Sequence, residues 1–213
     1  PQSAADARVE DYAVWLGVSQ AEDADQTVAA LRGTQWDWLI VDHYGLDIEW
    51  EEQVRPHVTS LLVIDDLPGR RHECDLLLNQ NFSLGRLDRY EGLLPRTARV
   101  LLGPRYALLN RAYLAYRRTL QRRDGEVRRV LVFFGGTDPH NLTGIALEAL
   151  STPACRSLDV DVVIGPNNAH RASVETQAGV RPNTHLHGPR PHLADLIAMA
   201  DIGISAGGAT LWE

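Results

Sequence analysis

The chain has 213 residues, a formal net charge of −7 at pH 7 and 44% hydrophobic residues. It is long enough for one large or two small domains with a substantial core. The acidic balance argues against a general nucleic-acid binder, which needs a basic face. The longest apolar runs have the length of strands, and none approaches the roughly 20 residues of a membrane-spanning helix.

The cysteine and lysine content excludes several kinds of site. Cys74 and Cys155 lie far apart without a Cys-x-x-Cys motif, so they predict neither a disulfide framework nor a zinc site, and we expect a reducing cytoplasm. All 21 basic residues are arginine, which excludes a P-loop lysine and a Schiff-base lysine. We expect no metal ion and no cofactor. The single methionine, Met199, and the start at Pro1 indicate a fragment or a processed product.

The first half of the chain alternates short apolar runs with polar stretches. Asp23 or Asp25 is expected to cap a helix that runs to Leu31, before Gly33. The apolar run Trp36–Val41 predicts a strand buried on both faces, as in parallel sheets. The other expected strands are Tyr12–Val18, Leu61–Ile64, Asp75–Leu78 and Val100–Leu102, and a further helix is expected over Asp47–His57.

The pattern restarts after a helical and charged segment. Apolar residues at helical spacing predict a helix over about 106–123, and the charged segment 121–126 predicts a linker. The strands expected beyond it are Val130–Phe134, Leu158–Ile164, Thr184–Leu186 and Ile202–Ile204. The helices expected between them are Asn141–Leu150, Ala169–Ala178 and Pro191–Ala200, and a last helix is expected after Ser205–Gly208.

These repeated strand–helix–strand units predict an α/β protein with two open, mostly parallel layers. We place the first domain at residues 1–105, a connecting helix and linker at 106–125, and the second domain at 126–213. The chain stops inside an expected element, so we expect both domains to be incomplete.

Residues at the carboxyl ends of the strands are the functional candidates, because ligands of open α/β sheets bind there. In the second half these ends carry glycines and hydroxyls, which suit a phosphate: glycine lets the backbone approach closely, and a following helix offers N–H groups. Ordinary strand-to-helix turns are the alternative interpretation. Neither loop is Gly-x-Gly-x-x-Gly, which disfavours NAD. The candidates are Gly135, Gly136, Thr137, Ser205, Gly207, Gly208 and Thr210.

The strand ends of the first half carry acids, a histidine and a tyrosine. His43 and Tyr44 follow a buried strand, and a histidine titrates near neutral pH. Asp65 and Asp66 follow the next strand, where they could orient a histidine such as His72 or bind a metal. Neighbouring strand residues point to opposite faces, so at most one of these two acids faces the site. Capping a loop is the alternative role for either acid.

Several of these residues stand in an ordered set of short blocks. The blocks are Asp42-His43-Tyr44-Gly45, Ile64-Asp65-Asp66, Leu78-Asn79-Gln80-Asn81, Gly103-Pro104-Arg105-Tyr106, Phe134-Gly135-Gly136-Thr137-Asp138 and Ser205-Ala206-Gly207-Gly208-Ala209-Thr210. Their joint order resembles the UDP-2,4-diacetamido-2,4,6-trideoxy-β-L-altropyranose hydrolase family of pseudaminic acid biosynthesis, which is similar to GT-B glycosyltransferases. The blocks cover nearly all of the chain beyond about Trp36.

The resemblance implies two Rossmann-like domains of the GT-B type, with UDP bound by the C-terminal one. It implies hydrolysis of a UDP-linked 2,4-diacetamido-2,4,6-trideoxy sugar at the anomeric carbon. It places Gly136, Thr137, Ser205, Gly207 and Gly208 near the phosphates, Asn141 at the start of the helix after the Gly-Gly-Thr-Asp loop, Glu213 against the ribose hydroxyls, and Tyr44 in the active site. Asp65, at its strand end, is a second catalytic candidate.

One departure keeps alternatives open. The family begins with a Gly-x-Gly-His loop whose histidine is taken as the general base, and we expect this chain to begin after that loop because it contains no such motif. The alternatives are a GT-B glycosyltransferase with a UDP-sugar donor and a UDP-sugar-binding module without catalysis. The expected partner is a UDP-sugar, with no nucleic acid and no membrane segment. Fusion to an acyltransferase domain beyond residue 213 is a further option.

Overall fold

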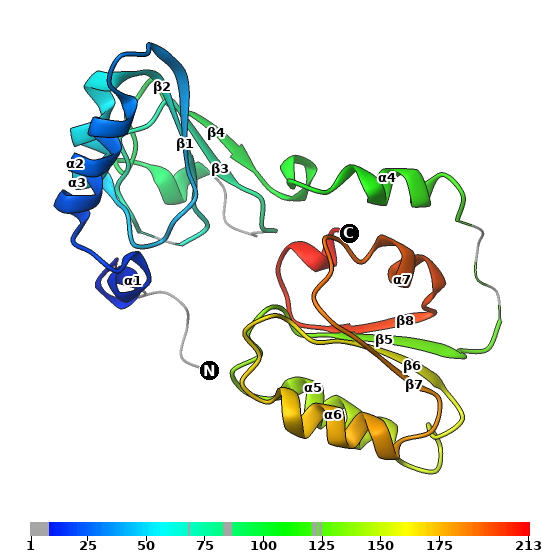
Figure 1. The fold of residues 1–213 in the computed structure, drawn as a ribbon. Coiled ribbons are helices and arrows are strands. Elements are labelled where there is room, and N and C mark those ends of the chain that lie inside the picture. Colours follow the sequence, from blue (N-terminus) through cyan, green and yellow to red (C-terminus); the bar gives the residue numbers. More distant parts are fainter. Residues whose placement is uncertain (1–8, 68, 83–86, 121–122, 124) are drawn as a thin grey trace. The chain divides into compact units, whose positions relative to one another are not determined.

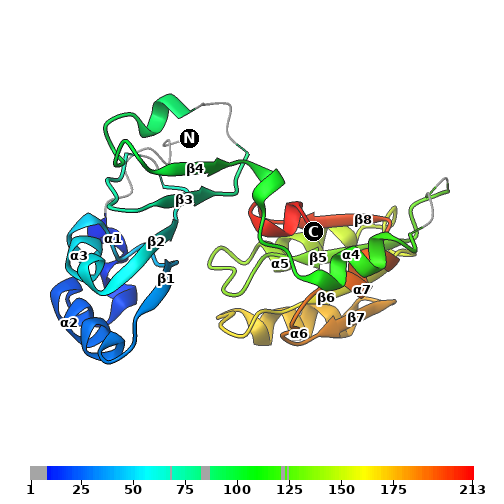
Figure 2. The same ribbon diagram turned by 90° about the horizontal axis from the view of Figure 1, so that it is seen from above.

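The computed structural model describes residues 9–67, 69–82, 87–120, 123 and 125–213 (Figure 1). The chain divides into two compact units, Pro1–Leu108 (unit 1) and Leu109–Glu213 (unit 2). Each unit contains one four-stranded sheet whose neighbouring strands all run parallel (Figure 2). The protein is therefore α/β, and its two sheets are consistent with Rossmann-like domains.

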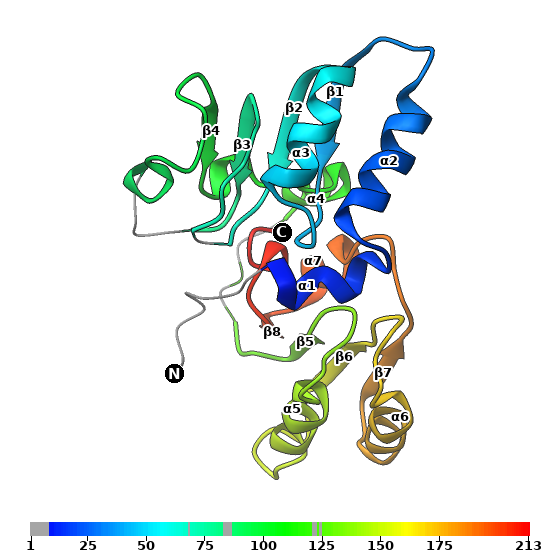
Figure 3. The ribbon, with the colours of Figure 1, turned by 90° about the vertical axis from the view of Figure 1, so that its left-hand side faces the viewer.

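In unit 1 the strands lie in chain order, β1-β2-β3-β4. Helices α2 and α3 cover one face of this sheet (Figure 3), where Val41, Leu61 and Leu77 pack against Trp50 and Val54. The elements of the unit are α1 (Val9–Leu16), α2 (Gln20–Leu31), β1 (Trp36–Val41), α3 (Ile48–Val54), β2 (Val58–Ile64), β3 (Leu76–Asn79) and β4 (Arg99–Leu102), with 3-10 helices at Arg55–His57, Leu87–Tyr90 and Pro104–Tyr106.

In unit 2 the strand order is β7-β6-β5-β8, so its first strand, β5, is central. Helices α5 and α6 cover one face of the sheet, and α4 and α7 lie on the other (Figure 1). From β5 the chain adds β6 and β7 on one side of β5, and it then adds β8 on the other side, so the strand order reverses between β5 and β8. The elements are α4 (Arg111–Arg117), β5 (Arg129–Phe133), α5 (Leu142–Leu150), β6 (Asp159–Val163), α6 (Arg171–Val180), β7 (Thr184–His187), α7 (Ala194–Met199), β8 (Ile202–Ser205) and a 3-10 helix (Ala209–Leu211).

The strand predicted at Tyr12–Val18 is wrong, because Tyr12–Leu16 lies in helix α1. Tyr12 and Leu16 are partly buried and stand four residues apart, whereas Val14 and Trp15 are exposed. This spacing is helical, and a short apolar run is compatible with both periods.

Helix α2 ends at the predicted Leu31 but begins earlier than expected. Its N-cap is Ser19, whose hydroxyl accepts a hydrogen bond from the N–H of Glu22 at 3.2 Å. Asp23 and Asp25 lie inside the helix, so their predicted capping role is wrong. Ser19 and Glu22 have the Ser-x-x-Glu spacing of a capping box, and this spacing is the stronger signal for the helix start.

Strand β1 has the predicted bounds but is open on one face. Trp36, Trp38 and Ile40 are exposed, whereas Val41 is buried in the core. β1 pairs only with β2 among the described strands, so it forms an edge of the sheet. The prediction of a strand buried on both faces is therefore wrong.

Three predicted helices of the second half are shorter in the structure. Helix α4 begins after its cap Asn110 and ends at Arg117. Helix α7 begins after its N-cap Leu193 instead of at Pro191, and the N–H of Leu193 donates to the Tyr113 hydroxyl. The helix expected after β8 is a single 3-10 turn. Of the predicted linker, residues 121, 122 and 124 lie outside the described residues, as does Pro68 of the loop before His72.

A search of the described helices for a membrane-crossing segment finds none that combines the necessary length with sufficient apolar character.

Candidate functional site

The carboxyl ends of β5 and β8 form the natural ligand position of unit 2. Strand order reverses between these two neighbours, and open α/β sheets bind ligands at such a reversal. The loop after β5 contains Gly135 with φ 83°, and the loop after β8 contains Gly208 with φ 106°. Both angles lie in the left-handed region that glycine adopts without strain. The glycines therefore let each strand turn sharply at the edge where a ligand would lie.

Gly165, after β6, fixes the position of the β5 loop. A Cβ at Gly165 would lie 2.3 Å from the carbonyl oxygen and 2.4 Å from the Cα of Gly136. The N–H of Asn167 donates to the same Gly136 carbonyl at 3.1 Å. The β6 loop thus packs directly on the backbone of the β5 loop, and only glycine fits at the contact.

The N-terminus of α5 is already occupied by a side chain. The buried Asp138 carboxylate accepts from the N–H of Leu142 at 2.8 Å and of Thr143 at 2.9 Å. Burial alone would raise the pKa of Asp138, but the hydrogen bonds from Thr143 and Leu142 outweigh it and hold the pKa below its usual value. These two N–H groups are therefore not free for an anion. Asn141 precedes the helix in a left-handed conformation, and its buried Oδ1 has no hydrogen-bond partner among the described residues.

A cavity of about 200 Å³ lies at this edge of unit 2. Three predicted residues, Gly136, Thr210 and Glu213, line it. The other predicted residues follow β5 and β8 but are absent from its lining: Gly135, Thr137, Asn141, Ser205, Gly207 and Gly208. The structure therefore brings the two predicted loops to one cavity, the first through Gly136 and the second through Thr210.

The cavity also contains residues that the sequence interpretation missed. Arg190 and His192, from the loop between β7 and α7, line it together with Tyr113. The Arg190 guanidinium donates to Asp195, and the buried Nδ1 of His192 has no partner within the described part of the chain. The signal was available in the sequence, because Pro-Arg-Pro-His begins three residues after the predicted strand Thr184–Leu186. Arg190 thus places a guanidinium, paired with Asp195, next to the glycine loops.

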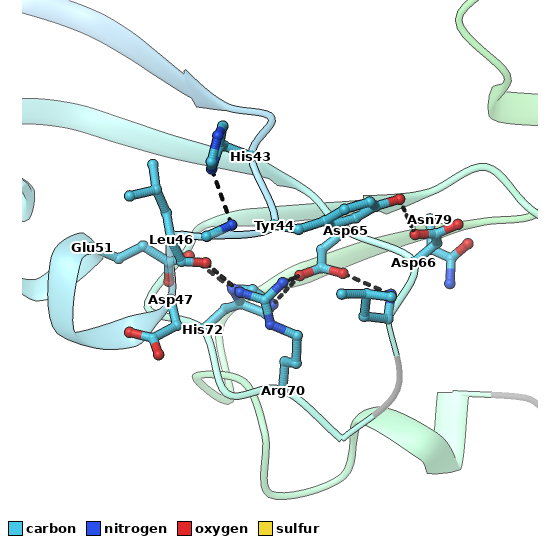
Figure 4. A network of polar contacts seen from close by, with 12 residues as sticks. His43, Tyr44, Leu46, Asp47, Glu51, Asp65, Asp66, Arg70, His72 and Asn79 are labelled. Carbon is cyan, nitrogen blue, oxygen red and sulfur yellow. Dashed lines mark hydrogen bonds and ion pairs between the residues drawn. The ribbon is translucent and has the colours of Figure 1, made fainter. Parts of the chain in front are cut away.

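Unit 1 has a second cavity, of about 250 Å³, at the carboxyl ends of β1, β2 and β3. Its polar lining consists of Asp42, Tyr44, Asp65, Asp66 and Gln80. The Tyr44 hydroxyl donates to Asp66 Oδ1 at 2.5 Å (Figure 4). The three carboxylates make the polar lining of this cavity mainly acidic.

Asp65 belongs to a buried network of four charged side chains. Its Oδ2 lies 2.7 Å from Arg70 Nη1 and 3.2 Å from His72 Nε2, and its Oδ1 accepts from the N–H of Leu67 at 2.7 Å (Figure 4). His72 Nδ1 lies 2.7 Å from Glu51 Oε1. The suggested pairing of Asp65 with His72 is thus present, and the Asp65 carboxylate is held by three partners.

His72 is held in its charged form by this network. Burial alone would lower its pKa, but the hydrogen bonds and charges of Asp65 and Glu51 outweigh burial and raise the pKa to about 9. Both ring nitrogens face carboxylate oxygens, and only the imidazolium donates from both. The network is therefore two cations paired with two anions inside the core of unit 1.

This charge state predicts a pH dependence of stability. The raised pKa of His72 stabilises the fold fully below pH 6.5, and this contribution is lost as pH rises toward about 9. We expect the free energy of unfolding of unit 1 to fall over that interval. Urea unfolding across the interval and an NMR titration of the His72 ring measure it. A His72 ring that titrates near 6.5, with no stability slope, would contradict the charged network.

Other candidates of the first half take no part in either cavity. The N–H of Gly45 donates to His43 Nδ1 at 3.0 Å, and His43 lies apart from the network (Figure 4). Cys74 is buried in the core, and burial raises its pKa to about 12, so it fills space as expected. Within the described residues, no group of three or more metal-ligating side chains is placed to hold a metal ion.

Comparisons with known proteins give three similar sequences and no family match. No protein-family model matches the chain. The chain is 25% identical over 178 residues to the UDP-2,4-diacetamido-2,4,6-trideoxy-β-L-altropyranose hydrolase of Campylobacter jejuni. The aligned segment covers 83% of this chain and 62% of that protein. It is 25% identical over 188 residues to the spore coat polysaccharide biosynthesis protein SpsG of Bacillus subtilis, with 86% and 54% covered. It is 23% identical over 202 residues to an uncharacterized protein of Methanocaldococcus jannaschii, with 92% and 42% covered.

These similarities support a related sugar-biosynthesis family and not one particular member. They suggest a role connected with nucleotide sugars in a sugar or polysaccharide pathway. The chain spans between 42% and 62% of the length of these relatives.

Proposed function

We propose that the protein hydrolyses a UDP-linked 2,4-diacetamido-2,4,6-trideoxy sugar at the anomeric carbon and releases UDP and the free sugar, as a step of pseudaminic acid biosynthesis. The observation that carries the proposal is the cavity of unit 2, where Gly136, Thr210 and Glu213 meet at the reversal of strand order. The similarity to the Campylobacter jejuni hydrolase supports the same chemistry.

Unit 2 is the proposed nucleotide-binding part. Because Asp138 occupies two N–H groups of α5, we assign the diphosphate to the backbone N–H groups and hydroxyls of the two glycine loops. These groups belong to Gly135, Gly136, Thr137, Ser205, Gly207, Gly208 and Thr210, with Asn141 at the helix start. Arg190 adds a positive charge at the cavity, and the Glu213 carboxylate would accept hydrogen bonds from the ribose hydroxyls.

Unit 1 is the proposed sugar-binding part. Its cavity is lined by three carboxylates, which disfavour a diphosphate and suit hydroxyl and N–H donors. Tyr44 would contact the sugar or the attacking water. Asp65 is held by Arg70 and His72, so we assign it the role of fixing the turn that carries Asp66.

The proposed step is a displacement by water. The water oxygen bonds to the anomeric carbon as the bond from that carbon to the diphosphate oxygen breaks, and the electron pair leaves with UDP. Backbone N–H groups stabilise the charge on UDP. A base accepts the proton of the water. By the resemblance, the base is the histidine of a Gly-x-Gly-His loop, a motif this sequence does not contain.

Incubation of the protein at its natural full length with the UDP-sugar tests this function. We expect equal amounts of UDP and free sugar, and a rate about 10²-fold lower for Tyr44→Phe. The matched control is Tyr116→Phe, at an exposed position of α4, with an unchanged rate. Release that requires an added acceptor alcohol would show a glycosyltransferase instead. UDP binding without release would show a binding module.

Two expectations about the whole protein stay predictions: a fusion to an acyltransferase domain and a location in the cytoplasm.

A further inference from the structure

Asp66, which lies outside the predicted catalytic set, is bonded to Tyr44. The Tyr44 hydroxyl donates to Asp66 Oδ1 at 2.5 Å, and the Asn81 amide donates to Asp66 Oδ2. Both carboxylate oxygens are therefore held from different elements, Tyr44 after β1 and Asn81 after β3. The carboxylate cannot rotate without losing one of these bonds.

This bond decides which way the phenol proton points. An ionised carboxylate only accepts hydrogen bonds, and a phenol has one proton to give. The Tyr44 proton is therefore committed to Asp66. Only the lone pairs of the Tyr44 oxygen remain for a ligand.

The geometry points to Asp66 as a positioning residue that holds the Tyr44 proton, so that Tyr44 meets its ligand as a hydrogen-bond acceptor. The ligand atom at Tyr44 must then be a donor: a sugar hydroxyl, an acetamido N–H or the attacking water, and neither a carbonyl nor a phosphate oxygen. This inference rests on the proposed function for the identity of the ligand, but the direction of the proton follows from unit 1 alone.

The surroundings of Tyr44 agree with this direction. The charged and titratable groups around it are Asp42, Asp65 and Asp66 in the cavity lining and Tyr12 against its ring, at 5.1 Å between centroids. Partial burial, the hydrogen bond and charge of Asp66, and the nearby Asp65 and Tyr12 raise the pKa of Tyr44, which keeps the phenol protonated at neutral pH.

One lining side chain supplies the complementary donor. Gln80 Oε1 accepts from the N–H of Leu108 at 3.0 Å, which leaves the Gln80 NH₂ group as the donating end of that amide. The cavity thus combines the acceptors Tyr44, Asp42 and Asp66 with one amide donor. A neutral ligand rich in hydroxyl and N–H groups fits this set, and an anion does not.

The variant Asp66→Asn reverses the direction of the hydrogen bond between this position and Tyr44. The new amide keeps its oxygen toward the Asn81 donor and turns its NH₂ toward Tyr44, so the Tyr44 oxygen accepts and its proton points into the cavity. We expect Asp66→Asn and Tyr44→Phe each to lower kcat about 10²-fold, and the double variant to lose about as much as Tyr44→Phe alone. The control is Asp37→Asn, an exposed position of β1, with unchanged kcat.

A kcat for Asp66→Asn within about threefold of the wild type, or a double-variant loss equal to the product of the single losses, would overturn the proposal. Thermal unfolding of each variant tests whether the fold is retained.

A second measurement needs no turnover. The ultraviolet titration of tyrosinate in the wild type, minus that of Tyr44→Phe, isolates Tyr44 beside Asp66. The titration of Asp66→Asn, minus that of the double variant, isolates Tyr44 without this carboxylate. We expect Tyr44 to ionise at lower pH in Asp66→Asn than in the wild type. An unchanged titration would overturn the proposal. If the wild type releases no UDP, the proposed function fails while this titration still decides the role of Asp66.

Discussion

Gly165→Ala is expected to destabilise unit 2 strongly and to weaken its nucleotide binding. The new Cβ would lie 2.3–2.5 Å from three backbone atoms of Gly136, so the β5 loop itself would have to move. Overpacking against backbone costs about 3 kcal/mol of unfolding free energy. The displaced loop carries Gly135, Gly136 and Thr137, so we also expect UDP affinity to fall at least about tenfold. Denaturant unfolding and calorimetric titration with UDP measure the two effects.

Gly179→Ala is the matched control for this substitution. Gly179 lies in helix α6 and is exposed, and a Cβ there meets no atom within 4 Å. Alanine in a helix is more stable than glycine by about 0.5–1 kcal/mol, so this variant should be slightly stabilised and should bind as the wild type does. If Gly165→Ala unfolds and binds like Gly179→Ala, the packed contact between the two loops is refuted.

Asp65→Asn is expected to produce the largest loss of stability in unit 1. The substitution removes the negative charge between Arg70 and His72, and both cations are buried. Removing one partner from a buried ion pair costs about 3–5 kcal/mol, because the remaining charge lies uncompensated in the core. Urea unfolding followed by circular dichroism measures the change in the free energy of unfolding.

The control for Asp65→Asn is the same change at Asp37, which is exposed on β1. Surface substitutions of this kind stay within about 0.5 kcal/mol. The loss in Asp65→Asn should also be smaller at high pH, where His72 is neutral and needs less compensation. An Asp65→Asn protein as stable as Asp37→Asn would mean that the network contributes no stability.

Much of the fold could be predicted from the sequence, because most strands are largely apolar runs that end in glycines or polar residues. Strand β1 has the predicted bounds, and β2, β5 and β6 differ from the predictions only at their ends. The segment around Tyr12 could not be assigned from its short apolar run, because its helical face appears only when Leu16 packs against the core and Tyr12 against the ring of Tyr44.

The candidate site was predictable only in part. Position at a strand end identified Gly136, Thr210 and Tyr44, since all three line cavities at the carboxyl edges of the sheets. The pairing of Tyr44 with Asp66 instead of Asp65 was not predictable, because it depends on which face of the turn each acid occupies. Likewise, Asp138 looks like a phosphate-loop residue in sequence, and only the structure shows that it caps α5.

NMR titration of the isotope-labelled protein with UDP tests the central claim, which is that the glycine loops of unit 2 hold the nucleotide. We predict saturable shifts at the backbone amides of Gly136, Gly207 and Thr210, with the resonances of Tyr44 and Asp66 in unit 1 unchanged by UDP alone. Shifts confined to unit 1, or no saturable shift at the two loops, would contradict the account.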